Sequence, residues 1–282
     1  MSPERPDPKE AARAQPVQRG GPWAPRAEER KRAETAAEPR PFMSQDLVAT
    51  GIAGLDAQFH GGLPAGNTVL LLSDPSTAPS VFLAQYAAQG LLEGEHIHYF
   101  SLERPADDVM SDILNFVQDP DKMQNLHLVD GFPLQFKELP HASRGVLKID
   151  KGEDVLEALE NLLVDPDLSP PFRIIVDSFT EMLLSYEPKR VVRTLRLLRG
   201  VNRALQASAA VSMIGALHDP GQVATVRHLA DGVIEFETHR QGMGLYPVLL
   251  ITKMRGIPEP QRLLLYKETD KGLWLESTKR VQ

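Results

Sequence analysis

Cysteine is absent from this chain of 282 residues. Without thiols the protein cannot form disulfides, zinc–thiolate sites or iron–sulfur clusters, and it has no thiol nucleophile. These absences exclude a disulfide-stapled secreted protein and a cysteine protease, and they make a reducing cytoplasm the expected location. Long apolar runs are missing too, because no stretch of 18 uncharged apolar residues occurs. The sequence therefore predicts a soluble protein that has no membrane partner.

Basic residues are in the minority. The chain has 31 Lys and Arg against 38 Asp and Glu, a formal net charge of −7. A dedicated DNA-binding domain is usually basic, so the charge argues against that class. The length suits one large domain with an appendage, which is enough to bury a sizeable core.

The first 42 residues differ in composition from the rest. They contain 9 Lys and Arg, 7 Asp and Glu, 8 Pro and 8 Ala, and very few large apolar side chains. Such a segment buries too little apolar surface to offset the entropy of ordering it. We therefore expect a disordered tail over residues 1–42 and a folded domain over 43–282, with Met43 as an alternative translation start to Met1.

Strand-like and helical patterns alternate through the folded part. Strands are predicted at 67–73, 96–102, 126–129, 172–176 and 209–217, and helices at 81–92, 105–117, 153–163 and 188–206. This alternation predicts an α/β fold with a mostly parallel twisted sheet and helices on both faces. Four further strands, at 231–237, 246–253, 261–267 and 272–276, follow one another through short links and predict an antiparallel C-terminal edge. Residues 133–152 are predicted to form a lengthened loop.

Six short segments of the chain resemble the same family. They are TGIAGLD at 50–56, GGLPAG at 61–66, FSLE at 100–103, IIVDS at 174–178, LADGVI at 229–234 and KMRG at 253–256. In this order they resemble the RecA-superfamily ATPases of the KaiC type, a group that also includes archaeal recombinase paralogues. The resemblance covers about residues 46–278 and implies a RecA-like P-loop NTPase fold.

The family's phosphate-binding loop, Gly-x-x-Gly-x-Gly-Lys-Thr, falls on residues 74–81. In its place the chain has Asp74, Thr77 and Pro79 for the three glycines, Ser80 for the lysine and Val81 for the Mg²⁺-binding threonine. Pro79 has no N–H to donate to a phosphate, and Ser80 carries no positive charge. Each lost charge-assisted hydrogen bond costs ~1.5–3 kcal/mol. The comparison therefore predicts a degenerate Walker A motif and no ATP or Mg²⁺ cofactor.

Two carboxylates, Glu103 and Asp177, occupy the positions of the family's catalytic and Walker B acids. The family commonly has two adjacent glutamates at the first position, whereas here Arg104 follows Glu103 and should hold its carboxylate ionised and paired. Asp177 would help to hold Mg²⁺, but its expected partner is replaced by Val81. Both acids are predicted to be vestigial. In the alternative interpretation Asp177 and Ser178 simply cap the sheet edge or the next helix.

Lys253 and Arg255 are two residues apart on a predicted strand and so point to the same side. In the resembling family such a pair reaches across a ring interface to the neighbour's γ-phosphate. In this chain we expect it to bind a neighbour's carboxylate, Asp74 or Glu103, at an oligomer interface. An ordinary solvated pair of side chains is the alternative.

The predicted helix at 188–206 carries a stripe of arginines: Arg190, Arg193, Arg196, Arg199 and Arg203. A stripe of this kind is usually a solvated face, and a polyanion-binding face is the alternative. The eight histidines form no cluster with the spacing of metal ligands, so no metal site is predicted.

Three functions remain open. The residues favour a KaiC-like RecA-fold protein that has lost its P-loop chemistry and acts as a regulatory or scaffold subunit, in a homo-oligomer or together with an active KaiC-like relative. The first alternative is an atypical ATPase of the KaiC family that uses Glu103 and Asp177. The second is a DNA recombination or repair accessory that uses the arginine helix and the tail, whose binding would weaken with salt.

Overall fold

The computed structural model describes residues 46–77, 79–132, 154–242, 244–257 and 262–275. All of them belong to one compact unit spanning residues 45–282. The predicted tail at 1–42 and the predicted loop at 133–152 lie outside the described residues. Within the described part, no helix is long and apolar enough to cross a bilayer.

A sheet of nine strands forms the centre of the fold, in the order β11-β10-β9-β8-β3-β7-β6-β4-β5. Its strands are β3 (Thr68–Ser73), β4 (His96–Ser101), β5 (Leu126–Asp130), β6 (Phe172–Asp177), β7 (Ser208–Ile214), β8 (Gly232–Gln241), β9 (Gly244–Met254), β10 (Arg262–Thr269) and β11 (Gly272–Leu275). The strands from β5 to β8 along this order pair in parallel, and β8 to β11 pair antiparallel. This arrangement confirms the predicted fold class. A separate two-stranded ladder joins β1 (Leu47–Val48) to β2 (Leu63–Pro64).

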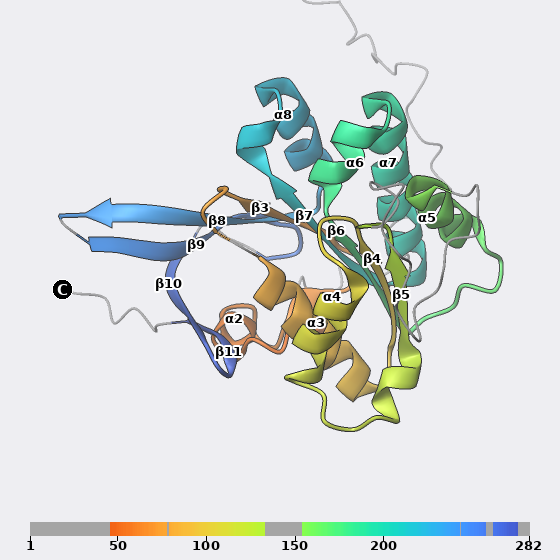
Figure 1. Ribbon diagram of the computed structural model, residues 1–282, viewed down its shortest axis with the longest axis horizontal. Helices are drawn as coiled ribbons and strands as arrows, with labels where there is room; N and C mark the ends of the chain where they lie inside the picture. Colours follow the sequence, from red (N-terminus) through yellow and green to blue (C-terminus); the bar gives the residue numbers. More distant parts are fainter. Residues whose placement is uncertain (1–45, 78, 133–153, 243, 258–261, 276–282) are drawn as a thin grey trace, which may run out of the picture. The chain divides into compact units, whose positions relative to one another are not determined.

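Helices cover both faces of the sheet (Figure 1). One face carries α2 (Ala53–Gln58), α3 (Ser80–Glu93) and α4 (Ala106–Leu114), and the other carries α5 (Val155–Val164), α6 (Phe179–Ser185), α7 (Pro188–Leu205) and α8 (Pro220–Leu229). Two 3-10 turns, at Lys122–Asn125 and Gly215–Leu217, complete the connections. The sequence analysis missed α2, α6 and α8, three short helices of 6, 7 and 10 residues.

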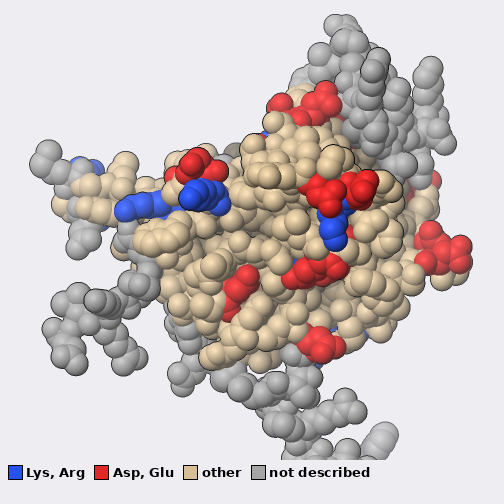
Figure 2. All heavy atoms as spheres, turned by 90° about the horizontal axis from the view of Figure 1, so that it is seen from below, with Lys and Arg blue, Asp and Glu red and all other residues tan. Residues whose placement is uncertain are grey.

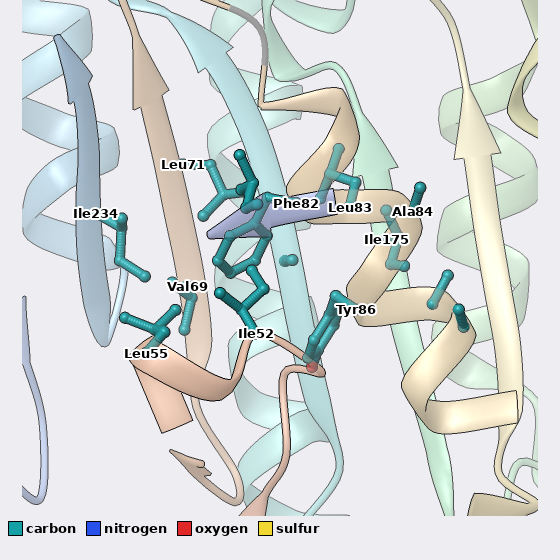
Figure 3. Close-up of a cluster of buried hydrophobic side chains, with 14 of the residues drawn as sticks. Ile52, Leu55, Val69, Leu71, Phe82, Leu83, Ala84, Tyr86, Ile175 and Ile234 are labelled. Carbon is teal, nitrogen blue, oxygen red and sulfur yellow. The ribbon is translucent and has the colours of Figure 1, made fainter. Parts of the chain in front are cut away.

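The position of β3 between two hydrophobic cores explains why its sequence is almost continuously apolar. Val69 and Leu71 point into the core under α2 and α3, where Phe82 lies beside them (Figure 3). The alternate residues of the strand belong to the core on the opposite face. A central parallel strand is covered on both sides and has no polar face to present to water.

Arg173, at the start of β6, is the most deeply buried cation among the described residues, with a side chain that is 0% exposed. Its guanidinium donates to Glu95 through Nε and Nη2, both at 2.8 Å, and to Glu93 at 3.0 Å. The remaining nitrogen donates to the carbonyl oxygens of Ala49 and Tyr86 at 2.7 and 3.0 Å. The group also lies 4.6 Å from the centre of the Tyr86 ring. One side chain thus joins β6 to α3, to the α3–β4 turn and to the segment before α2.

We predict that Arg173→Met lowers the free energy of unfolding by about 3–5 kcal/mol, because it leaves buried carbonyls and the carboxylate of Glu95 without their partner. Urea unfolding followed by circular dichroism measures the loss. The matched control is Arg190→Met, which removes a partly exposed guanidinium paired with Glu160 and Asp154 and should cost about 1 kcal/mol or less. Equal losses in the two variants would contradict the central role of Arg173.

Candidate functional site

A hollow of about 230 Å³ lies where the carboxyl ends of β3, β4, β6 and β7 meet the start of α3. Ligands of open α/β sheets bind at this edge. The hollow is lined by Ser73, Pro75, Thr77, Pro79, Ser80, Glu103, Arg104, Asp177, Ser178, Ser212, Met213 and Ile214. The structure therefore brings three of the five loop residues that the sequence analysis named, Thr77, Pro79 and Ser80, together with the two carboxylates, whereas Asp74 and Val81 do not line the hollow.

Two amides of the loop after β3 are already bonded, one to strand β8 and one within the loop. The N–H of Asp74 donates to the carbonyl of Phe236 at 3.1 Å, and the N–H of Thr77 donates to the carbonyl of Asp74 at 3.0 Å. Pro75 and Pro79 have no N–H at all. A phosphate-binding loop instead directs free amides at its ligand. Four positions of this loop therefore have no amide to offer.

Helix α3 begins at Ser80, with Pro79 as its N-cap residue and no side-chain cap. Ser80 lines the hollow, so the position that the resemblance gives to a lysine carries a hydroxyl there. Val81 is partly buried and packs against the core on the α3 side of the sheet. Its side chain takes part in apolar packing and has no oxygen to bind a metal ion.

Asp177 ends β6 and is almost fully buried, with a relative exposure of 4%. Its two carboxylate oxygens accept hydrogen bonds from the hydroxyls of Ser212, at 2.7 Å, and Tyr99, at 3.0 Å. Burial raises the pKa of the Asp177 carboxyl, while these two hydrogen bonds and the charge of Arg104 act to lower it. The carboxylate is thus built into the sheet and also reaches the wall of the hollow.

The expected pairing of Glu103 with Arg104 is wrong. Arg104 binds Asp112 of α4 instead, with 2.5 Å between Nη2 and Oδ2, although it still lines the hollow. Glu103 instead accepts a hydrogen bond from the hydroxyl of Ser178. Burial raises the pKa of Glu103, and the nearby carboxylates of Asp177 and Glu181 add to the rise, whereas the hydrogen bond from Ser178 and the charge of Arg104 oppose it. Adjacency in sequence misled because α4 begins at Ala106 and brings Asp112 within reach of the arginine.

Lys253 and Arg255 have separate environments. The ammonium of Lys253 donates to the carbonyls at the end of α8, those of Arg227, His228 and Ala230, at 3.2, 3.0 and 2.5 Å. Arg255 lies just beyond the end of β9 rather than on the strand. Its half-exposed side chain approaches Asp231 at 3.5 Å. Of the predicted pair, Lys253 is therefore occupied within its own chain, and Arg255 is the more accessible cation.

The arginines of α7 divide into groups. Arg190 pairs with Glu160 at 2.8 Å and Asp154 at 3.3 Å, which serves to hold α5 and α7 together. Arg199 and Arg203 point toward Asp231, near the end of the helix. Arg193 and Arg196 are exposed and make no ion pair with any described residue. The five side chains therefore differ in their partners.

Metal ligands do not assemble in the described part of the chain, where no group of three or more His, Asp or Glu side chains is arranged to hold an ion. Three histidines do come together on β4 and β5. The ring of His127 stacks on those of His96 and His98, with centroids 5.5 and 4.9 Å apart. Burial, together with the charges of the two neighbouring rings, lowers the pKa of His98 to about 4. His98 is therefore neutral at physiological pH.

The strand order, the crossover helices and a hollow at the end of β3 define a RecA-like fold of the P-loop NTPase type. Residues 48–279 match the family described as "ATPase: KaiC". The chain belongs to this family.

Relatives of the chain cover most of its length. A UPF0273 protein of Aeropyrum pernix is 31% identical over 244 residues, which is 84% of this chain and 96% of the relative. A UPF0273 protein of Thermotoga maritima is 27% identical over 230 residues, 80% of this chain and 94% of the relative. The crystal structure of a KaiC-like protein from Pyrococcus horikoshii superposes with a TM-score of 0.61 at 22% identity, covering 83% of this chain and all of that one.

The raised pKa of Asp177 has a consequence for stability. Between the pKa of the unfolded carboxyl, near 3.8, and the higher folded value, the folded state holds a proton that the unfolded state has lost. The contribution of Asp177 to stability is therefore lost as the pH rises through the folded pKa. We predict that the free energy of unfolding of Asp177→Asn, relative to that of the wild type, increases by roughly 0.5–2 kcal/mol from pH 4 to pH 7, because the amide never becomes charged.

Urea unfolding at the two pH values tests this prediction. Asp108→Asn, an exposed carboxylate in the first turn of α4, is the control and should shift by less than about 0.5 kcal/mol. If the difference in unfolding free energy between Asp177→Asn and the wild type were the same at both pH values, the raised pKa of Asp177 would be refuted.

Proposed function

We propose that this chain is a RecA-fold subunit that has lost the P-loop chemistry of its family and acts through protein–protein assembly. The observation that carries the proposal is the state of the loop after β3. The amides of Asp74 and Thr77 are already bonded, Pro75 and Pro79 have none, and α3 begins with Ser80. Four positions of the loop therefore offer no backbone donor to a phosphate, and Ser80 brings no positive charge where such loops carry a lysine.

The charges around the hollow support the same proposal. Arg104 is the one basic residue among the described residues that line it, and its guanidinium is bound by Asp112. Glu103 and Asp177 supply carboxylates, and Asp74 stands exposed at the loop. A polyphosphate would meet acidic groups without a compensating cation. If two charge-assisted hydrogen bonds of ~1.5–3 kcal/mol each are lost, affinity falls by roughly two to four orders of magnitude.

Assembly would use the accessible arginine. Arg255 is half exposed, so the carboxylate of Asp74 or Glu103 in a neighbouring copy, or in a KaiC-like relative, can take the place that a phosphate holds in the resembling family. Acidic side chains also predominate on the face covered by α3 and α4 (Figure 2). A contact between different surfaces of two copies is heterologous and produces a ring or a filament.

An atypical ATPase is the second candidate. The specific observation in its favour is that Glu103, whose pKa is raised, lies beside Ser178 and Asp177 in one hollow. Perturbed carboxyls gathered in a cleft are the mark of acid–base sites. The nucleotide measurement below separates the two candidates.

We expect calorimetry of the full chain with ATP or ADP at millimolar concentration, with and without Mg²⁺, to give no binding heat. A variant that carries Asp74→Gly, Pro79→Gly, Ser80→Lys and Val81→Thr together should gain Mg²⁺-dependent binding, because it restores the loop's freedom, charge and metal ligand. Micromolar Mg²⁺-dependent binding by the wild type, lost in Asp177→Asn, would reject the proposal and establish the second candidate.

The assembly half of the proposal predicts an oligomer that depends on Arg255. Light scattering coupled to size exclusion should give a multiple of the 31.2 kDa chain mass for the wild type and a smaller mass for Arg255→Glu. Arg193→Glu makes the same change of charge at an exposed position of α7 and should leave the mass unaltered. A monomeric wild type, or an Arg255→Glu variant of unchanged mass, would remove this interface.

A further inference from the structure

Three guanidinium groups converge on one carboxylate at the amino ends of β3 and β8, at the end of the sheet opposite the hollow. Oδ1 of Asp231 lies 3.0 Å from Arg199, 3.1 Å from Arg203 and 3.5 Å from Arg255. The side chain of Asp231 is 0% exposed, and its other oxygen accepts a hydrogen bond from the N–H of Thr68 at 3.4 Å. A single buried charge thus holds three cations in place.

The cluster is far from electrically neutral. The three arginine side chains remain 35%, 42% and 50% exposed, so each one is partly open to solvent. The exposed Arg196 stands one turn before Arg199 on α7 and adds a fourth cation. The carboxyl end of α7 contributes only about half a negative charge. Two or more positive charges remain here in a chain whose net charge is −7.

Two hollows open beside these arginines. The first, of about 230 Å³, is lined by Arg196, Arg199, Gly200 and Arg203. The second, of about 200 Å³, is lined by Ala65, Gly66, Asn67, Arg203, Gln206 and Arg255. Arg203 is common to both, so the two hollows adjoin.

Gly200 lines the first hollow without a side chain. A Cβ placed on Gly200 would meet no atom within 4 Å, so no packing constraint of the described residues requires glycine. Glycine in the middle of a helix costs stability relative to alanine. Gly200 therefore leaves free space beside the arginines of α7 and lowers the stability of the helix relative to alanine.

We propose that this arginine cluster is a binding site for a compact polyphosphate, an anion with at least two phosphoryl groups. The planar guanidinium fork matches phosphate oxygens and binds them through paired hydrogen bonds. Asp231 preorganises three of the forks, and the adjoining hollows give neighbouring phosphoryl groups separate places around Arg203. The site is distinct from the hollow at Ser73, because the ends of β3, at Thr68 and Ser73, are roughly 17 Å apart.

A nucleic-acid strand fits the cluster less well. Single strands are held by a basic groove together with aromatic side chains on which the bases stack. Among the described residues that line the two hollows, none is aromatic. The folded part as a whole, residues 43–282, carries a net charge of −9, which opposes a long polyanion.

Calorimetry with tripolyphosphate on the full chain, without Mg²⁺, tests the site. The wild type should bind, and its affinity should fall roughly tenfold between 50 and 200 mM salt. Gly200→Glu places a carboxylate in the first hollow and should weaken binding at least tenfold, as should Arg196→Gln. Gly200→Ala, which adds only a methyl group in open space, and Arg193→Gln, which lies outside both hollows, are the matched controls and should bind like the wild type.

Absence of tripolyphosphate binding would overturn the proposal, and so would equal binding by Gly200→Glu and Gly200→Ala. Binding of a single-stranded oligonucleotide in place of tripolyphosphate would overturn it in favour of nucleic acid. None of these variants alters the loop after β3, so this result is independent of the proposed loss of ATP chemistry. Arg255 lines the second hollow and is also the residue of the proposed oligomer interface. Because every variant leaves Arg255 unchanged, a loss of binding cannot come from a changed interface contact of that residue.

Discussion

The buried guanidinium of Arg173 is the contact on which the arrangement of the layers depends. A charge that is fully removed from water is tolerated only where hydrogen bonds and opposite charges surround it, and Arg173 obtains both from Glu95, Glu93 and two backbone carbonyls. These partners come from α3, from the turn after it and from the segment before α2. The start of β6 is thereby fixed against the helical layer, and this fixes where the opposite end of the strand, at Asp177, emerges.

The two edges of the sheet differ in charge. At the carboxyl ends of the strands, Glu103 and Asp177 line a hollow whose one basic lining residue in the described chain is bound elsewhere. At the amino ends of β3 and β8, arginines outnumber the single carboxylate of Asp231. The proposed function and the proposed polyphosphate site follow from this contrast. The hollow at the carboxyl ends is lined by one basic residue, whereas the hollows at the amino ends are lined by several guanidinium groups, which can donate hydrogen bonds to a phosphate.

Much of the fold could be predicted from the sequence, because a parallel strand covered on both faces must be apolar at every position, as β3 is. The location of the candidate site could also be predicted, because the carboxyl ends of parallel strands meet at the same end of a sheet. The partners of individual charges could not. Arg104 was expected to pair with Glu103, but it pairs with Asp112 of α4. Lys253 was expected at an interface, but it binds backbone carbonyls at the end of α8. The convergence of α7 and Arg255 on Asp231 depends on chain reversals that no local pattern reveals.

The central claim is that the loop between β3 and α3 does not hold a nucleotide. Amide hydrogen exchange of the full chain, followed by mass spectrometry with and without millimolar Mg·ATP, tests it at the residues concerned. The account predicts identical exchange in peptides that cover Asp74 to Val81. Slower exchange at Ser80 and Val81 in the presence of Mg·ATP would show that their amides bind phosphate and would contradict it.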